Sequence, residues 1–219
     1  MVLPQPFTTA SPIIASYNWV DFAEGTGIIK FKGFRNNVSG SLAYGLTTSD
    51  VYSGGSPGEG IETKSAELSN ADYAKVLDLD FDLSVFNSSR TIRGTAIVSV
   101  PLGVYSTDAD QARGFIIARI KKGDVELVSA TSGDLPGVSG TNTYIHTLLL
   151  TIPLTHFKKG ETLRLTIEGW GRKFAEDVGN FIIIGHDPMN RDGTYIKPTV
   201  ETSATTKLEF HCPFDIKDA

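Results

Sequence analysis

The sequence predicts an all-β protein, an antiparallel β-sandwich of the jelly-roll type with about a dozen strands and few short helices. Alternating apolar and polar residues, the mark of strands with one buried face, recur from one end of the chain to the other. Long helical periodicity is absent, and glycine-containing turn signals separate the alternating segments. The 40% hydrophobic and 21% charged residues are typical of a folded globular chain.

The last strand, over 207–217, is the clearest, because Leu208, Phe210 and Cys212 share one face and Lys207 and Glu209 share the other. Turns at 121–124 and 158–161 each contain a glycine and join neighbouring strands. Only 65–76 and 106–113 suit short helices, and 47–60 and 129–142 read as long surface loops. The other strands are predicted over 16–22, 27–34, 41–46, 77–83, 91–100, 115–120, 125–128, 148–154, 163–168, 181–184 and 195–200.

The chain is predicted to form an extended N-terminal arm over 1–15 and a single sandwich domain over 16–219. The arm is punctuated by prolines, and the composition of the domain is even, without a repeat of fixed period. The N-terminal region has neither the basic residues nor the apolar run of a secretory signal or membrane span, so a soluble protein without a membrane partner is expected.

Charge and cysteine content narrow the function classes. A formal net charge of −5 is unlike the basic surface that binds nucleic acid, so no direct nucleic-acid partner is expected. Cys212 is the single cysteine, which rules out an intrachain disulfide and a cysteine-based zinc site.

One motif is formally catalytic. Gly54, Ser56 and Gly58 match the nucleophile elbow of α/β-hydrolases, but Pro57 lacks the backbone N–H that the oxyanion hole requires. The four histidines lack metal-ligand spacing and are interpreted as ordinary surface or strand-edge residues: His146, His156, His186 and His211. His146 or His211 could form an acid–base pair with a carboxylate from another strand, but a strand-face position is favoured. No catalytic residue is therefore predicted, no enzyme is expected, and a hydrolase is the least favoured of the functions considered.

Two groups of acidic side chains raise the question of a metal. Asp187, Asn190 and Asp192 supply oxygen atoms, but Pro188 breaks the spacing of a calcium loop, so a turn is favoured over a cation site. The alternate residues of the strand at 77–83 form an acidic face, which is expected to be solvated or to pair with a basic strip of a neighbouring subunit: Asp78, Asp80 and Asp82. Neither a metal nor another cofactor is therefore predicted.

Trp19 and Trp170 are aromatic candidates for a ligand site, although core or interface burial is the favoured interpretation. Trp170 lies between two glycines at a strand end, with Arg172 beside it. Together with Tyr195 these residues would form a platform for a surface glycan. This is the alternative function, a carbohydrate-binding or adhesive module with calcium at 187–192.

The segment Phe157-Lys158-Lys159-Gly160-Glu161, followed by Thr162-Leu163-Arg164-Leu165, and the alternating strand over 207–214 resemble late elements of jelly-roll structural proteins of viruses and bacteriophages. The resemblance covers about the last third of the chain. It implies a non-enzymatic capsid, decoration or fibre subunit located in the virion, which self-assembles as a homo-oligomer and contacts other particle proteins. Loops, strand edges and the N-terminal arm would make the contacts. No site residue is carried over from this family.

Overall fold

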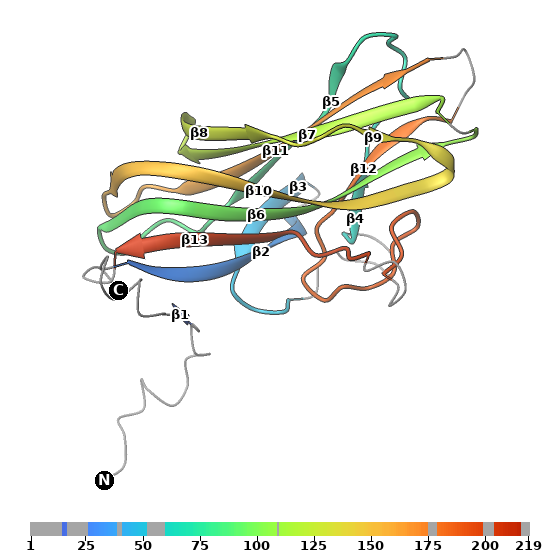
Figure 1. The fold of residues 1–219 in the computed structure, drawn as a ribbon. Helices are drawn as coiled ribbons and strands as arrows, with labels where there is room; N and C mark the ends of the chain where they lie inside the picture. Colours follow the sequence, from blue (N-terminus) through green and yellow to red (C-terminus); the bar gives the residue numbers. More distant parts are fainter. Residues whose placement is uncertain are drawn as a thin grey trace.

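The structure is a computed structural model that describes residues 15–16, 26–38, 41–51, 60–108, 110–174, 179–198 and 204–215. Within these residues all regular structure is β-strand, which confirms the predicted all-β class (Figure 1). The short helices expected within 65–76 and 106–113 do not form in the described parts of those segments. Instead the strands β5 (Ala74–Asp82), β6 (Arg90–Ser106) and β7 (Ala112–Lys122) include the ends of those segments, because neighbouring strands supply hydrogen-bond partners there. No helix able to cross a bilayer occurs in the described ranges.

Thirteen strands follow one another in the described chain. Their bounds are β1 (Ala15–Ser16), β2 (Thr26–Val38), β3 (Ser41–Thr47), β4 (Glu62–Lys64), β5 (Ala74–Asp82), β6 (Arg90–Ser106), β7 (Ala112–Lys122), β8 (Val125–Thr131), β9 (Leu135–Pro136), β10 (Val138–Phe157), β11 (Leu163–Lys173), β12 (Phe181–Gly185) and β13 (Glu209–Asp215). Of the predicted N-terminal arm, residues 1–14 lie outside the described residues, as does Trp19, so the division into arm and domain stays a prediction.

The strands form two layers that face each other (Figure 1). One layer contains β10, β6, β13 and β2 in that order, and the other contains β5, β11, β7 and β8. Strand β3 joins them, because it pairs antiparallel with β2 and parallel with β5. The sheet is therefore mixed rather than wholly antiparallel. A parallel pair needs a long connection in place of a hairpin, and the chain between β3 and β5, which includes β4, provides it.

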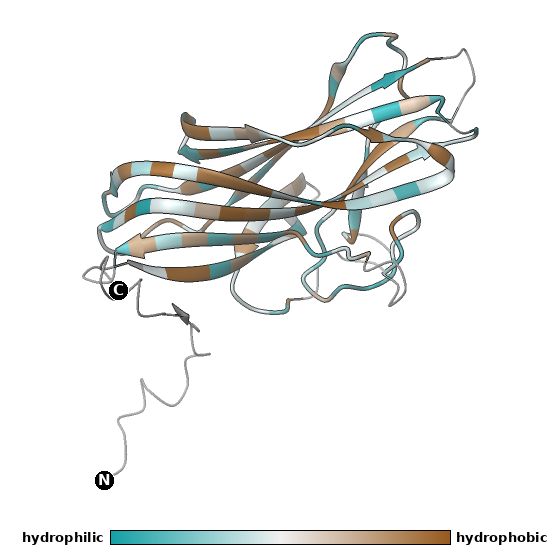
Figure 2. Cartoon of the chain, in the orientation of Figure 1, coloured by the Kyte–Doolittle hydropathy of each residue, from teal (hydrophilic) through white to brown (hydrophobic). Residues whose placement is uncertain are grey.

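The core lies between the two layers and is built by alternate residues of the long strands. Apolar bands alternate with polar ones along the ribbons in Figure 2, and the apolar positions face inward. Phe81, Phe157 and Phe210 are fully buried. Each comes from a different strand or strand end, so the aromatic side chains tie both layers to one continuous core.

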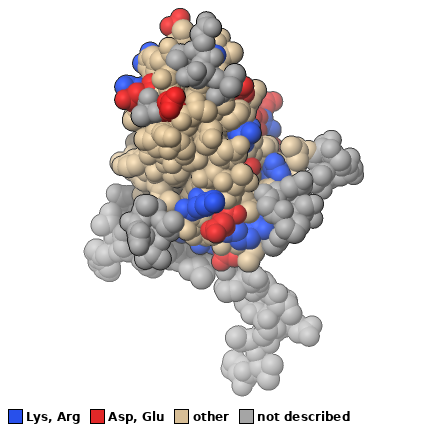
Figure 3. Space-filling view, turned by 90° about the vertical axis from the view of Figure 1, so that its right-hand side faces the viewer, with Lys and Arg blue, Asp and Glu red and all other residues tan. Residues whose placement is uncertain are grey.

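The surface at one end of the sandwich is poor in charge. Figure 3 shows a broad uncharged area, with charged side chains gathered above and below it. Lys and Arg lie beside Asp and Glu there rather than in a patch of one sign.

The segment predicted as a loop over 129–142 is mostly strand. β8 continues to Thr131, β9 pairs with β7, and β10 begins at Val138. Ser139, Thr141 and Asn142 look like loop residues in the sequence, but they pair with the end of β6, which holds them extended. The strand predicted over 195–200 is absent from its described part, 195–198, and residues 199–200 lie outside the described ranges.

One side of the sandwich is open. In the described chain β10 pairs with β6 alone and β8 pairs with β7 alone, so each has one edge without a partner strand. These two edges lie near each other on the same side of the molecule (Figure 1). The opening between them positions the candidate site.

Candidate functional site

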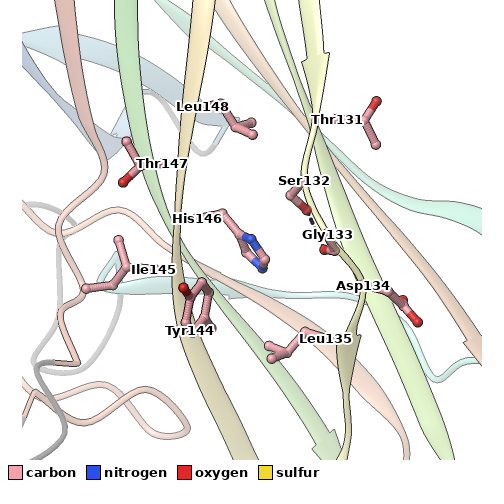
Figure 4. Close-up of a pocket in the computed structure, with 10 residues that line it drawn as sticks. All are labelled: Thr131, Ser132, Gly133, Asp134, Leu135, Tyr144, Ile145, His146, Thr147 and Leu148. Carbon is pink, nitrogen blue, oxygen red and sulfur yellow. Dashed lines mark hydrogen bonds between the residues drawn. The ribbon is translucent and has the colours of Figure 1, made fainter.

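A cleft of about 660 Å³ lies between the open edges of the two layers. Its walls are residues 144–148 of β10 and residues 131–135, which end β8 and lead into β9 (Figure 4). We call it the edge cleft. The sequence folds in this way because β10 and the β8–β9 segment are each held by a partner on their far side, which leaves the near sides apart.

Tyr144, His146 and Leu148 alternate along β10 and point into the edge cleft, whereas Ile145 and Thr147 point to the other side of the strand (Figure 4). The rings of Tyr144 and His146 meet edge to face with centroids 4.9 Å apart. Tyr144 is 58% exposed and His146 only 8% exposed. The tyrosine therefore forms the rim of the cleft and the histidine its floor.

His146 carries the chemistry of the edge cleft. Its Nε2 atom is buried, and it has no hydrogen-bond partner among the described residues. Burial lowers the pKa of the imidazole below its usual value, which keeps the ring neutral at pH 7. Buried polar atoms are nearly always paired, so an unpaired one in a cleft wall indicates a position that a ligand can satisfy.

The opposite wall is organised by hydrogen bonds. The Ser132 hydroxyl accepts from the backbone N–H of Ile116 at 3.0 Å and donates to the carbonyl of Gly133 at 2.9 Å. Buried Leu135 closes the same wall. These contacts fix the wall before any ligand arrives.

Asp134 belongs to the outer side of this wall. Its side chain points away from His146 in Figure 4, and it accepts a hydrogen bond from the Tyr73 hydroxyl at 2.6 Å. Arg113 lies 3.6 Å from the same carboxylate. Burial, and then the bond to Asp134, raise the pKa of Tyr73. His146 and Asp134 therefore do not form an acid–base pair.

The structure places the predicted metal candidates in the connection between β12 and β13. Asp187 is fully buried, and its carboxylate accepts from the backbone N–H and the guanidinium of Arg191 at 2.7–3.0 Å. Asn190 accepts from the backbone N–H of Thr206 at 2.9 Å, and Asp192 is exposed. The oxygen atoms of Asp187 and Asn190 thus organise a turn. Among the described residues no cluster of three His, Cys, Asp or Glu side chains could hold a metal.

The three predicted ligand-binding residues lie in two different places. Trp170 stacks on Phe115 on the outer face of β11 and β7, with Arg172 further along β11. Tyr195 instead packs against Tyr105 and Phe181, where Lys64 donates to its hydroxyl at 3.1 Å. The structure brings Trp170 and Arg172 to one surface and leaves Tyr195 at another.

The acidic face formed by Asp78, Asp80 and Asp82 makes ion pairs with basic side chains of the same chain. Arg164, on the adjacent strand β11, pairs with Asp82 and Asp80, and Lys75 pairs with Asp78. A basic strip on a neighbouring subunit is therefore not needed to balance these carboxylates. The formal nucleophile elbow at 54–58 lies outside the described residues.

The histidines differ more than their sequence contexts suggest. His156 is exposed, and His211 lies 3.6 Å from Glu209. His186 is fully buried, and its Nε2 shares a hydrogen bond of 2.8 Å with the Thr63 hydroxyl. The interpretation of all four as surface or strand-edge residues was wrong for His186. His146 does lie on the edge strand β10, but its ring is buried. The signal for His146 was present in the sequence, since it occupies an inward position between Tyr144 and Leu148 in an alternating segment.

Comparisons with known proteins found similar solved structures among hydrolases and viral capsid proteins. No known protein family matches the chain, and no curated protein is similar to it in sequence. A solved CocE/NonD family hydrolase from Staphylococcus aureus is similar, with a TM-score of 0.45, 13% identity, and coverage of 84% of this chain and 36% of that one. An α-amino acid ester hydrolase is also similar, with a TM-score of 0.47, 10% identity, and coverage of 84% of this chain and 36% of that one. The chain thus spans little more than a third of the length of these hydrolases.

The infectious bursal disease virus VP2 subviral particle is also similar, with a TM-score of 0.29, 8% identity, and coverage of 71% of this chain and 39% of that one. This likeness to a viral capsid protein is one of β fold. The two hydrolases have higher TM-scores, 0.45 and 0.47, than the virus protein, 0.29.

The prediction of a non-enzymatic virion subunit was therefore wrong. The stronger structural likenesses are to hydrolases, and they also contradict the prediction that the protein is not an enzyme. The physical reason is that strand alternation and glycine turns indicate a β-sandwich architecture. One such architecture can serve unrelated functions, so the pattern does not identify the function. We accordingly derive a function from the geometry of the edge cleft alone.

Proposed function

We propose that the chain binds a small, neutral, hydroxyl-bearing molecule in the edge cleft. The observation that carries this proposal is the buried Nε2 atom of His146, which lines the cleft and lacks a partner among the described residues. A ligand hydroxyl supplies that partner.

The size and lining of the cleft suit a small molecule. Ligand pockets commonly measure about 300–1,000 Å³ and combine apolar walls with a few polar groups. Here Leu135 and Leu148 supply apolar surface, the Tyr144 ring is available for contact with a second ring, and His146 is the polar group. Such a site orients one hydroxyl and packs the rest of the ligand against carbon.

The charge state of His146 selects a neutral ligand. Because burial keeps the imidazole uncharged, it has no cation with which to attract an acid. A neutral imidazole nitrogen either donates or accepts a hydrogen bond, depending on its tautomer, and a hydroxyl serves in both cases. A hydroxyl-bearing ligand therefore fits either tautomer of His146.

Phenol and toluene test this proposal, because they differ only in the replacement of a hydroxyl by a methyl group. Isothermal titration calorimetry is expected to show phenol binding up to about tenfold more tightly than toluene, since a hydrogen bond contributes about 0.5–1.5 kcal/mol net. In the variant His146→Leu the affinity for phenol should fall to that for toluene. The exposed His156, also on β10, offers a matched control, and His156→Leu should leave both affinities unchanged.

Three outcomes would overturn the proposal. Phenol fails to bind the wild-type chain, phenol and toluene bind equally well, or His146→Leu retains the wild-type preference for phenol. Each of them would mean that the Nε2 atom does not select the ligand.

A further inference from the structure

Two arginines occupy directly opposite positions on neighbouring strands. Arg172 of β11 is the cross-strand partner of Arg113 of β7. Like charges at opposite positions of an antiparallel pair repel each other and destabilise the sheet. Such a local conflict is typical of a functional site, where a ligand relieves it.

The two arginines are unequally neutralised. Arg113 has Asp134 at 3.6 Å and Asp110 at 3.9 Å. No carboxylate of the described chain lies within 4.0 Å of the Arg172 side-chain nitrogens. The Nε atoms of both arginines also lack hydrogen-bond partners in this part of the chain. The positive charge of Arg172 is therefore not balanced by an ion pair in this part of the chain, and each arginine keeps an unused Nε–H donor.

Aromatic rings hold Arg172 in place. Its guanidinium carbon lies 4.5 Å from the ring centroid of Tyr73 and 4.4 Å from that of Phe174. The guanidinium carbon of Arg113 lies 5.5 Å from the same Phe174 ring. Phe174 thus contacts both cations, and these contacts reduce the side-chain freedom that a ligand would otherwise have to remove.

A pair of stacked rings adjoins the arginines on the same outer face. Trp170 and Phe115 are cross-strand partners, two residues from Arg172 and Arg113 along their strands. Their rings are nearly parallel, with an interplanar angle of 6° and centroids 6.0 Å apart. The Trp170 Nε1 atom donates to Glu168 at 3.0 Å, which fixes the indole. The rings therefore offer a preformed surface for the flat or apolar face of a ligand ring.

We propose that Arg113 and Arg172 bind the carboxylate of a ring-bearing acid whose ring packs on Trp170 and Phe115. The planar guanidinium matches a carboxylate in geometry and charge. This site lies on the outer face of β7 and β11, meets the edge cleft through the wall residue Asp134, and does not depend on the function proposed for His146. An aromatic acid and a uronic sugar share the required chemistry.

Two matched pairs of probes distinguish these sources of the carboxylate. Benzoate and benzamide differ in charge but hardly in shape, and methyl glucuronide and methyl glucoside differ at one carbon. Binding is measured from the NMR signal of the Trp170 indole N–H, which Trp170→Phe identifies. We expect at least one of the two acids to bind tenfold or more tightly than its neutral match, and to bind less tightly in 0.5 M salt because salt screens the ion pair.

Variants separate the ion pair from general charge effects. Arg172→Gln should weaken binding of that acid at least tenfold, and Arg172→Lys, which keeps the charge without the planar fork, should weaken it less. Lys159→Gln removes the same charge from the turn before β11, separated from Arg172 by a strand about 30 Å long at roughly 3.4 Å per residue, and should have no effect. His146→Leu should also leave acid binding unchanged.

Equal binding of acids and neutral matches to the wild-type chain would overturn this inference whatever the stability of the variants. Wild-type affinity in a folded Arg172→Gln variant would overturn it as well. Loss of acid binding in His146→Leu would move the acid into the edge cleft, and this inference would then be wrong.

Discussion

Replacement of His146 by leucine is expected to stabilise the protein. The side chain is 8% exposed, and its buried Nε2 atom has no partner among the described residues. A buried polar group without a partner costs about 1–3 kcal/mol, and leucine removes that cost. The different shape of leucine takes back up to about 1.5 kcal/mol. We therefore expect the free energy of unfolding to rise by about 1 kcal/mol.

Urea and thermal unfolding followed by circular dichroism at pH 7.5 measure this change. For a chain of this length a gain of about 1 kcal/mol corresponds to a rise in Tm of about 2–4 °C. His156→Leu is the control, because this exposed histidine of the same strand has no buried atom to release, and its replacement should change the free energy of unfolding by no more than about 0.5 kcal/mol. A loss of more than about 1 kcal/mol in His146→Leu would refute the reasoning, since it would show that His146 is already paired in the folded protein.

Three further predictions concern stability. The pKa of His186 is about 3 in the folded protein and about 6.5 when unfolded, so the unfolded state holds the proton more tightly. The free energy of unfolding should therefore fall by up to about 1.4 kcal/mol per pH unit as the pH drops below 6.5. Urea unfolding at pH 7, 5 and 4 should show a shallower loss in His186→Asn than in the wild-type chain. The same dependence on pH in both proteins would contradict the assignment of this effect to His186. Gly114→Ala places a Cβ 2.3 Å from a side-chain atom of Ile182 and 3.1 Å from a backbone oxygen. This substitution should lower the free energy of unfolding by about 1–3 kcal/mol. Gly133→Ala, with open space around the added Cβ, should change the free energy of unfolding little. Equal changes in Tm for the two variants would contradict the close packing of Gly114 against Ile182. Arg164→Met removes the partly exposed pair with Asp82 and should cost about 1 kcal/mol, less in 1 M salt; a salt-independent loss would point to packing instead of charge.

The sequence predicted the strands in which apolar and polar residues alternate regularly over a long segment. The strand at 207–217 appears as β13, where Phe210 and Cys212 are buried, and the turn at 121–124 connects β7 to β8. In both cases local side-chain pattern and turn chemistry agree with the tertiary structure.

Other features depended on contacts between distant residues. The first part of β10 is rich in Ser, Gly and Thr, and only its pairing with β6 makes it a strand. The parallel pairing of β3 with β5 has no local signature either.

The candidate site was missed for the same reason. The edge cleft exists because two strand edges approach each other, and no spacing within one segment reveals this. Trp170 and Arg172 were identified as neighbours because they lie two residues apart in one strand, whereas Arg113 comes from β7 and was not predicted. Self-association of the chain and the absence of a nucleic-acid partner stay predictions.

The side-chain ¹⁵N resonances of His146 test the central claim most directly. They are measured by long-range ¹H–¹⁵N NMR at pH 7.5, with His146→Leu identifying the signals, before and after addition of phenol. We predict a neutral imidazole whose Nε2 resonance moves on addition of phenol as a hydrogen bond forms, while the signals of His156 and His211 stay in place. A His146 Nε2 resonance that phenol leaves unmoved, or that moves only together with those of the exposed histidines, would contradict the proposal that the edge cleft binds its ligand through this atom.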